Sequence, residues 1–265
     1  GHLVTRAIPN PDTATDNVPM ITGGVKTQGL HDFLYGKIEA RIFTNPHTGN
    51  FPAFWMMPSD QSKGWPNDGE IDIWEQIDMQ NTAYHTIHSN WTYNLGNKNT
   101  PQSSFSESCD MAQWHTYGLE WVDGLLKWYV DGKQVGSYAR ATDQNALDKG
   151  QWPFDKAFYL ILNQSVGNGS WAANADTGHT YETRFDWVRV YQEDPNVGIG
   201  SLEAHQPISV MPVAGGVLVS AARTLPVGIY DAAGRLVHRQ QVEGNVRIAL
   251  PAGVYVVNGH KVAVK

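Results

Sequence analysis

Three carboxylates lie within six residues of the chain, in the segment EIDIWE at 70–75. Glu70 and Asp72 are two residues apart, so their side chains leave the same face of a β-strand. Glu75 is five residues from Glu70 and would leave the opposite face of a regular strand. A β-bulge within Ile73–Trp74 adds one residue and returns Glu75 to the face of the other two acids. The spacing therefore predicts a bulged strand with three carboxylates along one face.

This arrangement suits the cleavage of a glycosidic bond with retention of configuration. That reaction needs two carboxyl groups about 5 Å apart, an ionised one that attacks the anomeric carbon and a protonated one that serves the leaving oxygen. Crowding of like charges raises the pKa of one of them, which keeps it protonated near neutral pH. The order along the strand does not tell which Glu plays which role. A solvated acidic face or a site for a hard cation remains an alternative.

The surroundings of the acids favour a carbohydrate ligand. The chain of 265 residues has 10 Trp and 11 Tyr, and Trp55, Trp65 and Trp74 lie close to the acids in the sequence. Flat aromatic faces stack on sugar rings, although any single Trp more often fills a core. The net charge of −7 argues against nucleic acid and anionic membranes as partners. No apolar run is long enough to span a membrane, and Cys109 alone forms no intrachain disulfide.

The elements that position these residues are predicted to be short strands. Gly and Pro are frequent, apolar runs are short and helical periodicity is almost absent, which favours an all-β sandwich or jelly roll. An Asp131-Gly132 pair predicts a hairpin turn. Strands are expected within residues 35–43, 51–58, 69–77, 82–91, 114–122, 125–139, 157–166 and 183–192.

The composition changes near residue 195, because Trp is absent from 192 onward. We therefore expect a catalytic jelly roll at 1–195, a polar linker at 196–206 and a small β-sandwich at 207–265. About 60 residues can form a separate small β-domain.

The segment GEIDIWE resembles the Glu-x-Asp-x-x-Glu signature of glycoside hydrolase family 16, the laminarinase and lichenase group. YGKIEARI and FPAFWMMP precede it, and WHTYGLEWVDGLLKWYVDGK and RFDWVRVYQ follow it, in the order of that family. The resemblance implies a β-jelly roll with a concave substrate cleft. It also implies a retaining endo-β-glucanase that hydrolyses β-1,3- or mixed-linkage β-1,3-1,4-glucan through a covalent glycosyl-enzyme intermediate, with no cofactor required for catalysis.

The same resemblance implies roles for single residues. Glu70 would be the nucleophile, Glu75 the acid/base and Asp72 the assisting acid. Asp186 corresponds to a ligand of a structural calcium, with a plain surface Asp as the alternative. The expected substrate-binding residues are Glu39, Arg41, Trp55, Trp65, His88, Trp91, Asn163 and Trp171. A structural ion pair is the alternative for Glu39 and Arg41.

The chain also departs from the family pattern. The family normally begins some dozens of residues further upstream, so N-terminal strands are expected to be missing, with sheet edges left open and calcium bound weakly or not at all. Phe51 stands where many relatives have Trp, and Trp74 occupies the bulge. These two departures from the family pattern leave open which glucan is the substrate. A non-catalytic glycan-binding jelly roll, a transglycosylase and another polysaccharide hydrolase of the family remain alternatives.

The tail, with GIYDAAGRLV and LPAGVYVV, resembles the C-terminal sorting domain of Bacteroidetes type IX secretion. That resemblance implies secretion machinery as a partner and a secreted or cell-surface protein. A small carbohydrate-binding module is the alternative, and the absence of Trp from the tail speaks against it.

Overall fold

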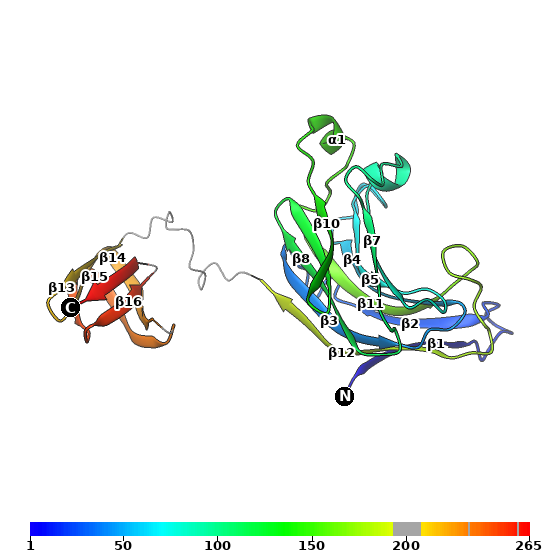
Figure 1. Cartoon of the computed structure of the whole chain (residues 1–265), viewed down its shortest axis with the longest axis horizontal. Coiled ribbons are helices and arrows are strands. Elements are labelled where there is room, and N and C mark those ends of the chain that lie inside the picture. The colour runs from blue at the N-terminus through cyan, green and yellow to red at the C-terminus, as the bar shows by residue number, and fades with distance from the viewer. Residues whose placement is uncertain (193–207, 233, 259) are drawn as a thin grey trace. The chain divides into compact units, whose positions relative to one another are not determined.

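The computed structural model describes residues 1–192, 208–232, 234–258 and 260–265. The chain divides into two compact units, Gly1–Gln192 and Glu193–Lys265, close to the boundary expected at 195 (Figure 1). The linker predicted at 196–206 lies outside the described residues. No helix in the described part is long and apolar enough to cross a membrane.

The first unit is built on twelve strands, in agreement with the predicted all-β class. They are hydrogen-bonded in the order β10-β9-β8-β3-β12-β1-β2-β11-β4-β5-β6-β7. The strands are β1 (Leu3–Pro9), β2 (Met20–Lys26), β3 (Gly36–Thr44), β4 (Asn50–Pro58), β5 (Glu70–Glu75), β6 (Thr82–His88), β7 (Ser104–Ser108), β8 (His115–Val122), β9 (Leu125–Val130), β10 (Lys133–Ala139), β11 (Phe158–Val166) and β12 (Tyr181–Tyr191).

The strand β2 joins the two halves of this order. Its first residues pair with β1, through Thr22 opposite Ala7, and its later residues pair with β11, through Gly24 opposite Asn163. A Cβ atom on Gly24 would lie 2.8 Å from the Cβ of Asn163, which is closer than real Cβ contacts. The glycine therefore allows β2 to approach β11 and to pass from one half to the other.

The two halves face each other across one hydrophobic core. In β3 alternate residues, such as Ile38 and Ala40, are fully buried, and in β5 Ile71 and Trp74 are fully buried; all belong to the same core cluster. The two sheets thus form the layers of a sandwich. Side chains of β3 that point away from this core therefore lie on one outer face of the sandwich, and those of β5 lie on the other outer face.

The predicted hairpin is present, because Asp131 and Gly132 join β9 to β10 with φ values of +48° and +80°. Both values lie in the left-handed region that a tight hairpin turn with the observed strand twist requires. All the expected segments contain strands, although the segment 82–91 ends its strand at His88. There Ser89 caps a π-helical turn, η1 (Asn90–Asn94), by accepting a hydrogen bond from the Thr92 backbone.

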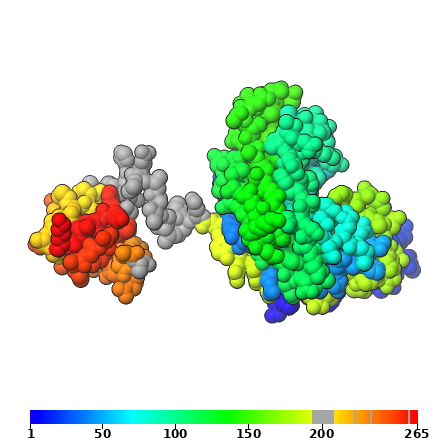
Figure 2. Space-filling view, in the orientation of Figure 1, coloured from blue at the N-terminus to red at the C-terminus, as the bar shows by residue number. Residues whose placement is uncertain are grey.

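Several elements were not predicted. The strands β1 and β2 are largely exposed and β7 is rich in Ser, so none of them shows a clean alternation of apolar residues. The helix α1 (Gln144–Asp148) is a single short helix capped by Asp143. It lies beside η1 at one end of the unit, where Asn90 Nδ2 donates to the Lys149 carbonyl at 2.9 Å (Figures 1 and 2).

The described part of the second unit is a five-stranded sheet with a core of its own. Val217, Val219, Val227 and Ile229 are fully buried there. Its strands are β13 (Ile208–Val213), β14 (Gly216–Asp231), β15 (Leu236–Ala249), β16 (Gly253–Val257) and β17 (His260–Val264), in the order β13-β14-β16-β17 with β15 also paired to β14.

Candidate active site

The strand β5 carries the predicted bulge. Asp72 lies opposite Thr86 of β6 and Glu75 lies opposite Tyr84, so three steps along β5 match two steps along β6. The pairing of β5 with β4 is offset in the same place. One residue is therefore extra within Ile73–Trp74, as the spacing of the acids predicted.

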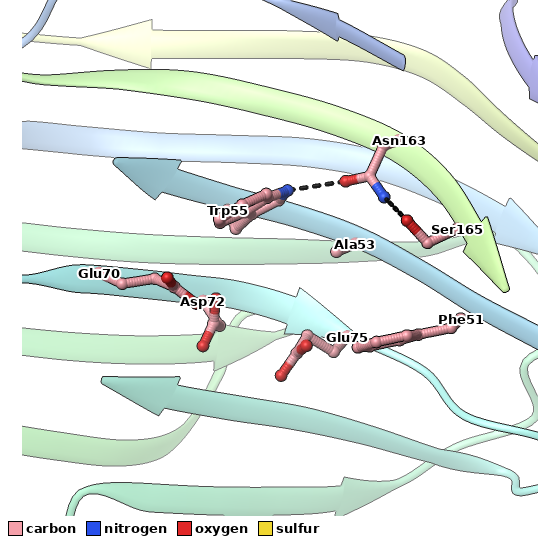
Figure 3. Close-up of a pocket in the computed structure, with 8 residues that line it drawn as sticks. All are labelled: Phe51, Ala53, Trp55, Glu70, Asp72, Glu75, Asn163 and Ser165. Atoms are coloured by element: carbon pink, nitrogen blue, oxygen red, sulfur yellow. Dashed lines mark hydrogen bonds between the residues drawn. The ribbon is translucent and has the colours of Figure 1, made fainter. Parts of the chain in front are cut away.

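The bulge separates the acids from their apolar neighbours. Ile73 and Trp74 are consecutive, yet both are fully buried in the core of the sandwich. Glu70, Asp72 and Glu75 line a pocket on the other face of β5 (Figure 3). The structure therefore brings the three predicted carboxylates together.

Two buried side chains hold the backbone at the bulge. Trp128 of β9, in the opposite layer, donates its indole N–H to the Asp72 carbonyl at 2.9 Å. His85 of β6 donates from Nδ1 to the Ile73 carbonyl at 2.6 Å. Burial lowers the pKa of His85 to about 4, so this histidine is neutral at ordinary pH. A bulge disrupts the ladder locally, and these donors satisfy the carbonyls of both residues.

The pocket is a cavity of about 190 Å³ between β4, β5 and β11. Trp55 forms one side, and its indole N–H donates to Asn163 Oδ1 at 2.7 Å. Asn163 in turn donates from Nδ2 to Ser165 Oγ at 2.8 Å (Figure 3). This chain of hydrogen bonds fixes the plane of the Trp55 ring. The residues that line the pocket are Phe51, Ala53, Trp55, Glu70, Asp72, Glu75, Asn163 and Ser165.

Glu70 has partners that stabilise its ionised form. Trp65 donates its indole N–H to Glu70 Oε2 at 2.7 Å, and His88 Nε2 lies 3.8 Å from Glu70 Oε1. His88 Nε2 also lies 3.3 Å from Oδ2 of Asp72, which is only 2% exposed. The pKa of Glu70 is nevertheless raised to about 8, mainly by burial and then by the charge of Asp72. The charge of His88 and the hydrogen bond from Trp65 lower this pKa but do not outweigh the burial. Burial also raises the pKa of Asp72 to about 7.

Glu75 has less support, because the charge of His88 is the only influence that lowers its pKa. Within the described residues no hydrogen bond reaches its carboxyl group, and no cation is paired with it. Burial, followed by the charge of Asp72, raises the pKa of Glu75 well above its ordinary value. The pKa of both glutamates is therefore raised, and of the two only Glu70 accepts a hydrogen bond from an indole N–H.

The other aromatic candidates lie in different places. Trp65 is 46% exposed beside His88 and Tyr93, at the Glu70 end of the pocket. Trp171 lies in a neighbouring hollow. Trp91 donates its indole N–H to the Thr100 carbonyl and lines neither the pocket nor this hollow. The sugar contact expected of Trp91 stays a prediction, outside the two described cavities.

The structure does not place Glu39 and Arg41 among the residues that line the pocket. Both lie on β3, where Ile38 and Ala40 face the core, so Glu39 and Arg41 point to the outer face of the layer opposite β5. Alternation correctly put the two side chains on one face but could not tell which layer the strand would join. Each forms an ion pair there, Glu39 with Lys37 at 2.7 Å and Arg41 with Asp186 at 2.7 Å.

Asp186 does not fit the calcium site that the family resemblance implies. Its carboxylate oxygens contact Arg41 Nη1 at 2.7 Å and His2 Nε2 at 3.5 Å. Calcium needs six to eight oxygen ligands, whereas Asp186 faces two basic side chains. In the described part of the chain the one group of three possible metal ligands is Glu70, Asp72 and His88, which belongs to the pocket.

A second hollow adjoins the pocket, with a volume of about 350 Å³. Phe51 and Ser165 line both cavities. Trp171 is 50% exposed there. Its ring makes a T-shaped contact with the ring of Tyr84, with 5.3 Å between the two ring centroids. The sequence indicated Trp171 but not the hollow. The lining residues are Phe51, Ser165, Val166, Gly167, Asn168, Ser170, Trp171 and Ala172.

Comparison with known proteins gives concordant matches. Residues 10–189 match the family model of glycosyl hydrolases family 16. A keratan-sulfate endo-1,4-β-galactosidase from Sphingobacterium multivorum is 35% identical over 72% of this chain and 44% of its own length. A β-glucanase from Rhodothermus marinus is 32% identical over 63% of this chain and 60% of its own length. The chain thus spans about half the length of these curated relatives.

A solved structure shares the fold of the first unit. The laminarinase from Rhodothermus marinus superposes with a TM-score of 0.64 at 28% identity, over 72% of this chain and 78% of the laminarinase.

Replacing Glu70 by Gln tests how much the burial of this acid lowers the stability of the folded chain as the pH rises. The folded chain holds the Glu70 proton up to about pH 8, whereas the ordinary pKa is 4.5. The unfolded chain therefore releases that proton first, and the stability contributed by the protonated acid is lost as the pH rises from 4.5 to 8. Gln does not titrate. We expect the melting temperature of Glu70→Gln to match the wild type near pH 4 and to exceed it by roughly 2 °C more per pH unit up to pH 8.

Differential scanning fluorimetry from pH 4 to 9 measures this gap. A Glu70→Gln offset that does not widen with pH would contradict the raised pKa.

Proposed function

This chain belongs to glycosyl hydrolases family 16, and from that membership we propose that it is a retaining endo-β-glucanase. It hydrolyses β-1,3- or mixed-linkage β-1,3-1,4-glucan through a covalent glycosyl-enzyme intermediate. The observation that carries the proposal is the bulged strand β5, which places Glu70, Asp72 and Glu75 on one face beside Trp55 and Trp65. The reaction needs two carboxyl groups, one that attacks the sugar and one that gives a proton to the leaving oxygen, and this strand supplies two glutamates in one pocket.

Glu70 acts as the nucleophile. Its ionised form accepts the Trp65 hydrogen bond and lies near His88, so it is the glutamate that attacks the anomeric carbon. Glu75 keeps its proton and donates it to the oxygen of the leaving sugar. Asp72, between them, shares the negative charge of the cluster and orients Glu70.

Formation of the intermediate changes the role of Glu75. The charge of Glu70 contributes to the raised pKa of Glu75, and that charge disappears when Glu70 becomes an ester to the sugar. The pKa of Glu75 then falls, so the carboxylate can take a proton from the attacking water. Water attack releases the sugar and restores ionised Glu70 and protonated Glu75. Attack by a sugar hydroxyl in place of water would give transglycosylation through the same intermediate.

The preferred substrate is a neutral β-glucan. The Rhodothermus marinus relative named as a β-glucanase and the superposed laminarinase support this choice. A second candidate is a polymer with β-1,4-galactosyl linkages, favoured by the keratan-sulfate endo-1,4-β-galactosidase relative. None of the residues that line the two described cavities is Lys or Arg, so a sulfate group would find no cationic partner among them. A purely glycan-binding protein would have no use for three buried carboxylates that lower stability.

Product analysis on laminarin, lichenan, barley β-glucan and keratan sulfate, side by side, tests the substrate. We expect oligosaccharides from at least one glucan, with the β-configuration of the new reducing end visible by NMR immediately after cleavage. Cleavage of keratan sulfate alone would establish the second candidate. Binding without cleavage of any polymer would identify a glycan-binding protein.

The roles of the two glutamates are separable by substitution. Glu70→Gln and Glu75→Gln should each lower kcat on the polymer by about 10²–10⁴-fold. A substrate with an activated aryl leaving group needs no proton from Glu75 in the first step, so Glu75→Gln should form the intermediate at nearly the normal rate. Mass spectrometry of the trapped glycosyl-enzyme should place the sugar on Glu70. A sugar attached to Glu75 would reverse the two roles.

No cofactor takes part in the proposed chemistry, because both proton transfers and the nucleophilic attack use carboxyl groups of the chain. We further propose that the Arg41–Asp186 ion pair occupies the position where relatives hold a structural calcium, so that bound calcium is weak or absent.

The second unit is the sorting domain that the secretion machinery recognises, and the protein is secreted or bound at the cell surface. Its separate core supports independent folding. Deleting residues 193–265 should leave kcat/KM on the polymer unchanged and should abolish export in a host that has type IX secretion. A loss of affinity for insoluble glucan on deletion would instead favour a carbohydrate-binding module.

A further inference from the structure

We propose that the outer face of the layer opposite β5 binds an acidic polysaccharide, a polymer whose sugars carry carboxylate or sulfate groups. The binding groups form what we call the arginine face, which consists of Arg6, Arg41, Arg184 and Arg189. The choice of a polysaccharide among acidic polymers rests on the proposed function, because an enzyme that cuts glycans works among them. The presence of a basic surface away from the carboxylate pocket does not rest on it.

The pairing of β3 with β12 puts these arginines on one surface. In β3, Glu39, Arg41 and Phe43 point outward, because they alternate with residues that are buried in the core. Residues directly opposite each other in an antiparallel pair share a face. Arg184 lies opposite Phe43, and Arg189 lies opposite Glu39. The strands β3, β12 and β1 are neighbours in the sheet, so the arginine face is continuous across them (Figure 1).

Aromatic rings on the same surface hold three of the guanidinium groups. The distances from Cζ to the ring centroid are 4.1 Å for Arg189 over Trp187, 5.1 Å for Arg41 over Trp114 and 5.7 Å for Arg184 over Phe43. An arginine that already lies over a ring loses less conformational freedom when it binds a ligand. Its planar set of N–H donors matches the paired oxygens of a carboxylate or a similar oxyanion.

The arginines outnumber the acids that pair with them. Glu182 of β12 lies opposite Arg6 and forms ion pairs with both Arg6 and Arg184, at 2.7 Å and 2.6 Å. Asp186 forms an ion pair with Arg41 at 2.7 Å. Four guanidinium groups thus face two carboxylates, on a chain whose net charge is −7. The surplus of positive charge attracts an anionic ligand to this face.

Many N–H groups of the arginine face are available to a ligand. Among the described residues, Arg189 has no hydrogen-bond acceptor and no ion pair, since Glu39 opposite it is paired with Lys37 at 2.7 Å. Within the same part of the chain, Arg184 donates only from Nε and Arg41 only from Nη1. The side chains of Arg184 and Arg41 are 46% and 42% exposed. Oxyanions of a ligand can therefore reach the remaining donors.

A polymer with well-separated charges fits this surface better than nucleic acid or an anionic membrane. The surplus charge of the arginine face is small, and the net negative charge of the chain repels a dense polyanion. An acidic polysaccharide carries its charges on separate sugar rings. None of the residues that line the two described cavities is Lys or Arg. The pocket and the arginine face therefore suit different glycans, a neutral one and an acidic one.

Binding to immobilised polymers tests this proposal on the full chain. Biolayer interferometry with polygalacturonate, dextran sulfate and neutral dextran compares a carboxylate polymer, a sulfate polymer and an uncharged one. We expect binding to at least one of the two acidic polymers at low ionic strength and none to dextran, with an affinity that falls as salt is added. Which acidic polymer binds identifies the acidic group. Binding to neither acidic polymer would overturn the proposal.

Substitutions locate the binding surface. The double variant Arg184→Gln with Arg189→Gln should weaken binding to the acidic polymer by about tenfold in Kd. The matched control is Arg140→Gln with Arg235→Gln, which removes the same charge at partly exposed positions after β10 and in the second unit. Equal melting temperatures of the two double variants and the wild type verify that the fold is kept. Equal weakening by both double variants would show that affinity follows net charge, and the arginine face would be refuted.

Two further measurements separate this proposal from the proposed function. Arg184 and Arg189 do not line the pocket, so their double variant should cleave neutral β-glucan at the normal rate. A wild-type chain that cleaves no glucan but binds an acidic polymer through these arginines would remove the glucanase and keep the arginine face. Binding of duplex DNA as tightly as the acidic polysaccharides, at the same ionic strength, would contradict the choice of ligand.

Discussion

The site depends on two hydrogen bonds to the backbone of one bulge, from Trp128 to the Asp72 carbonyl and from His85 to the Ile73 carbonyl. Without the extra residue, Glu75 would point into the core, where a carboxyl group has no partner. Trp128 comes from the opposite layer, so the packing between the two sheets fixes the alignment of the catalytic strand. The apolar neighbours Ile73 and Trp74 are therefore as necessary for the site as the acids are.

The difference between the two glutamates has a simple physical origin. Burial raises the pKa of both, and Asp72 adds negative charge near each of them. Glu70 receives the Trp65 indole N–H and lies near His88, whereas Glu75 has no hydrogen-bond donor among the described residues. One strand thus carries two glutamates in unlike surroundings, as the proposed double displacement needs.

The sequence predicted what depends on local spacing. Counting residues between the acids predicted the bulge, and Asp131-Gly132 predicted the hairpin. The sequence could not place Glu39 and Arg41 relative to the pocket, because alternation within a strand does not reveal which layer the strand joins. The hydrogen bond from the Ala173 backbone N–H to the Asp78 carboxylate spans 95 residues, and the contact of Trp128 with Asp72 spans 56. Such contacts have no local signature, so the second hollow and the support of the bulge came only from the structure.

The pairing of β1 with β12 has a consequence for the order in which this domain is made. Leu3 lies opposite Phe185, so one side of β1 waits for a strand that lies near the other end of the unit. β2 can pair with one side of β1 early, whereas the other side of β1 has no final partner while the middle of the chain is synthesised. Contacts of such long sequence separation slow folding. The unit must therefore complete its sheet late, after chain elongation has passed β12, and until then that side of β1 is a free edge open to chaperones and to pairing with other chains.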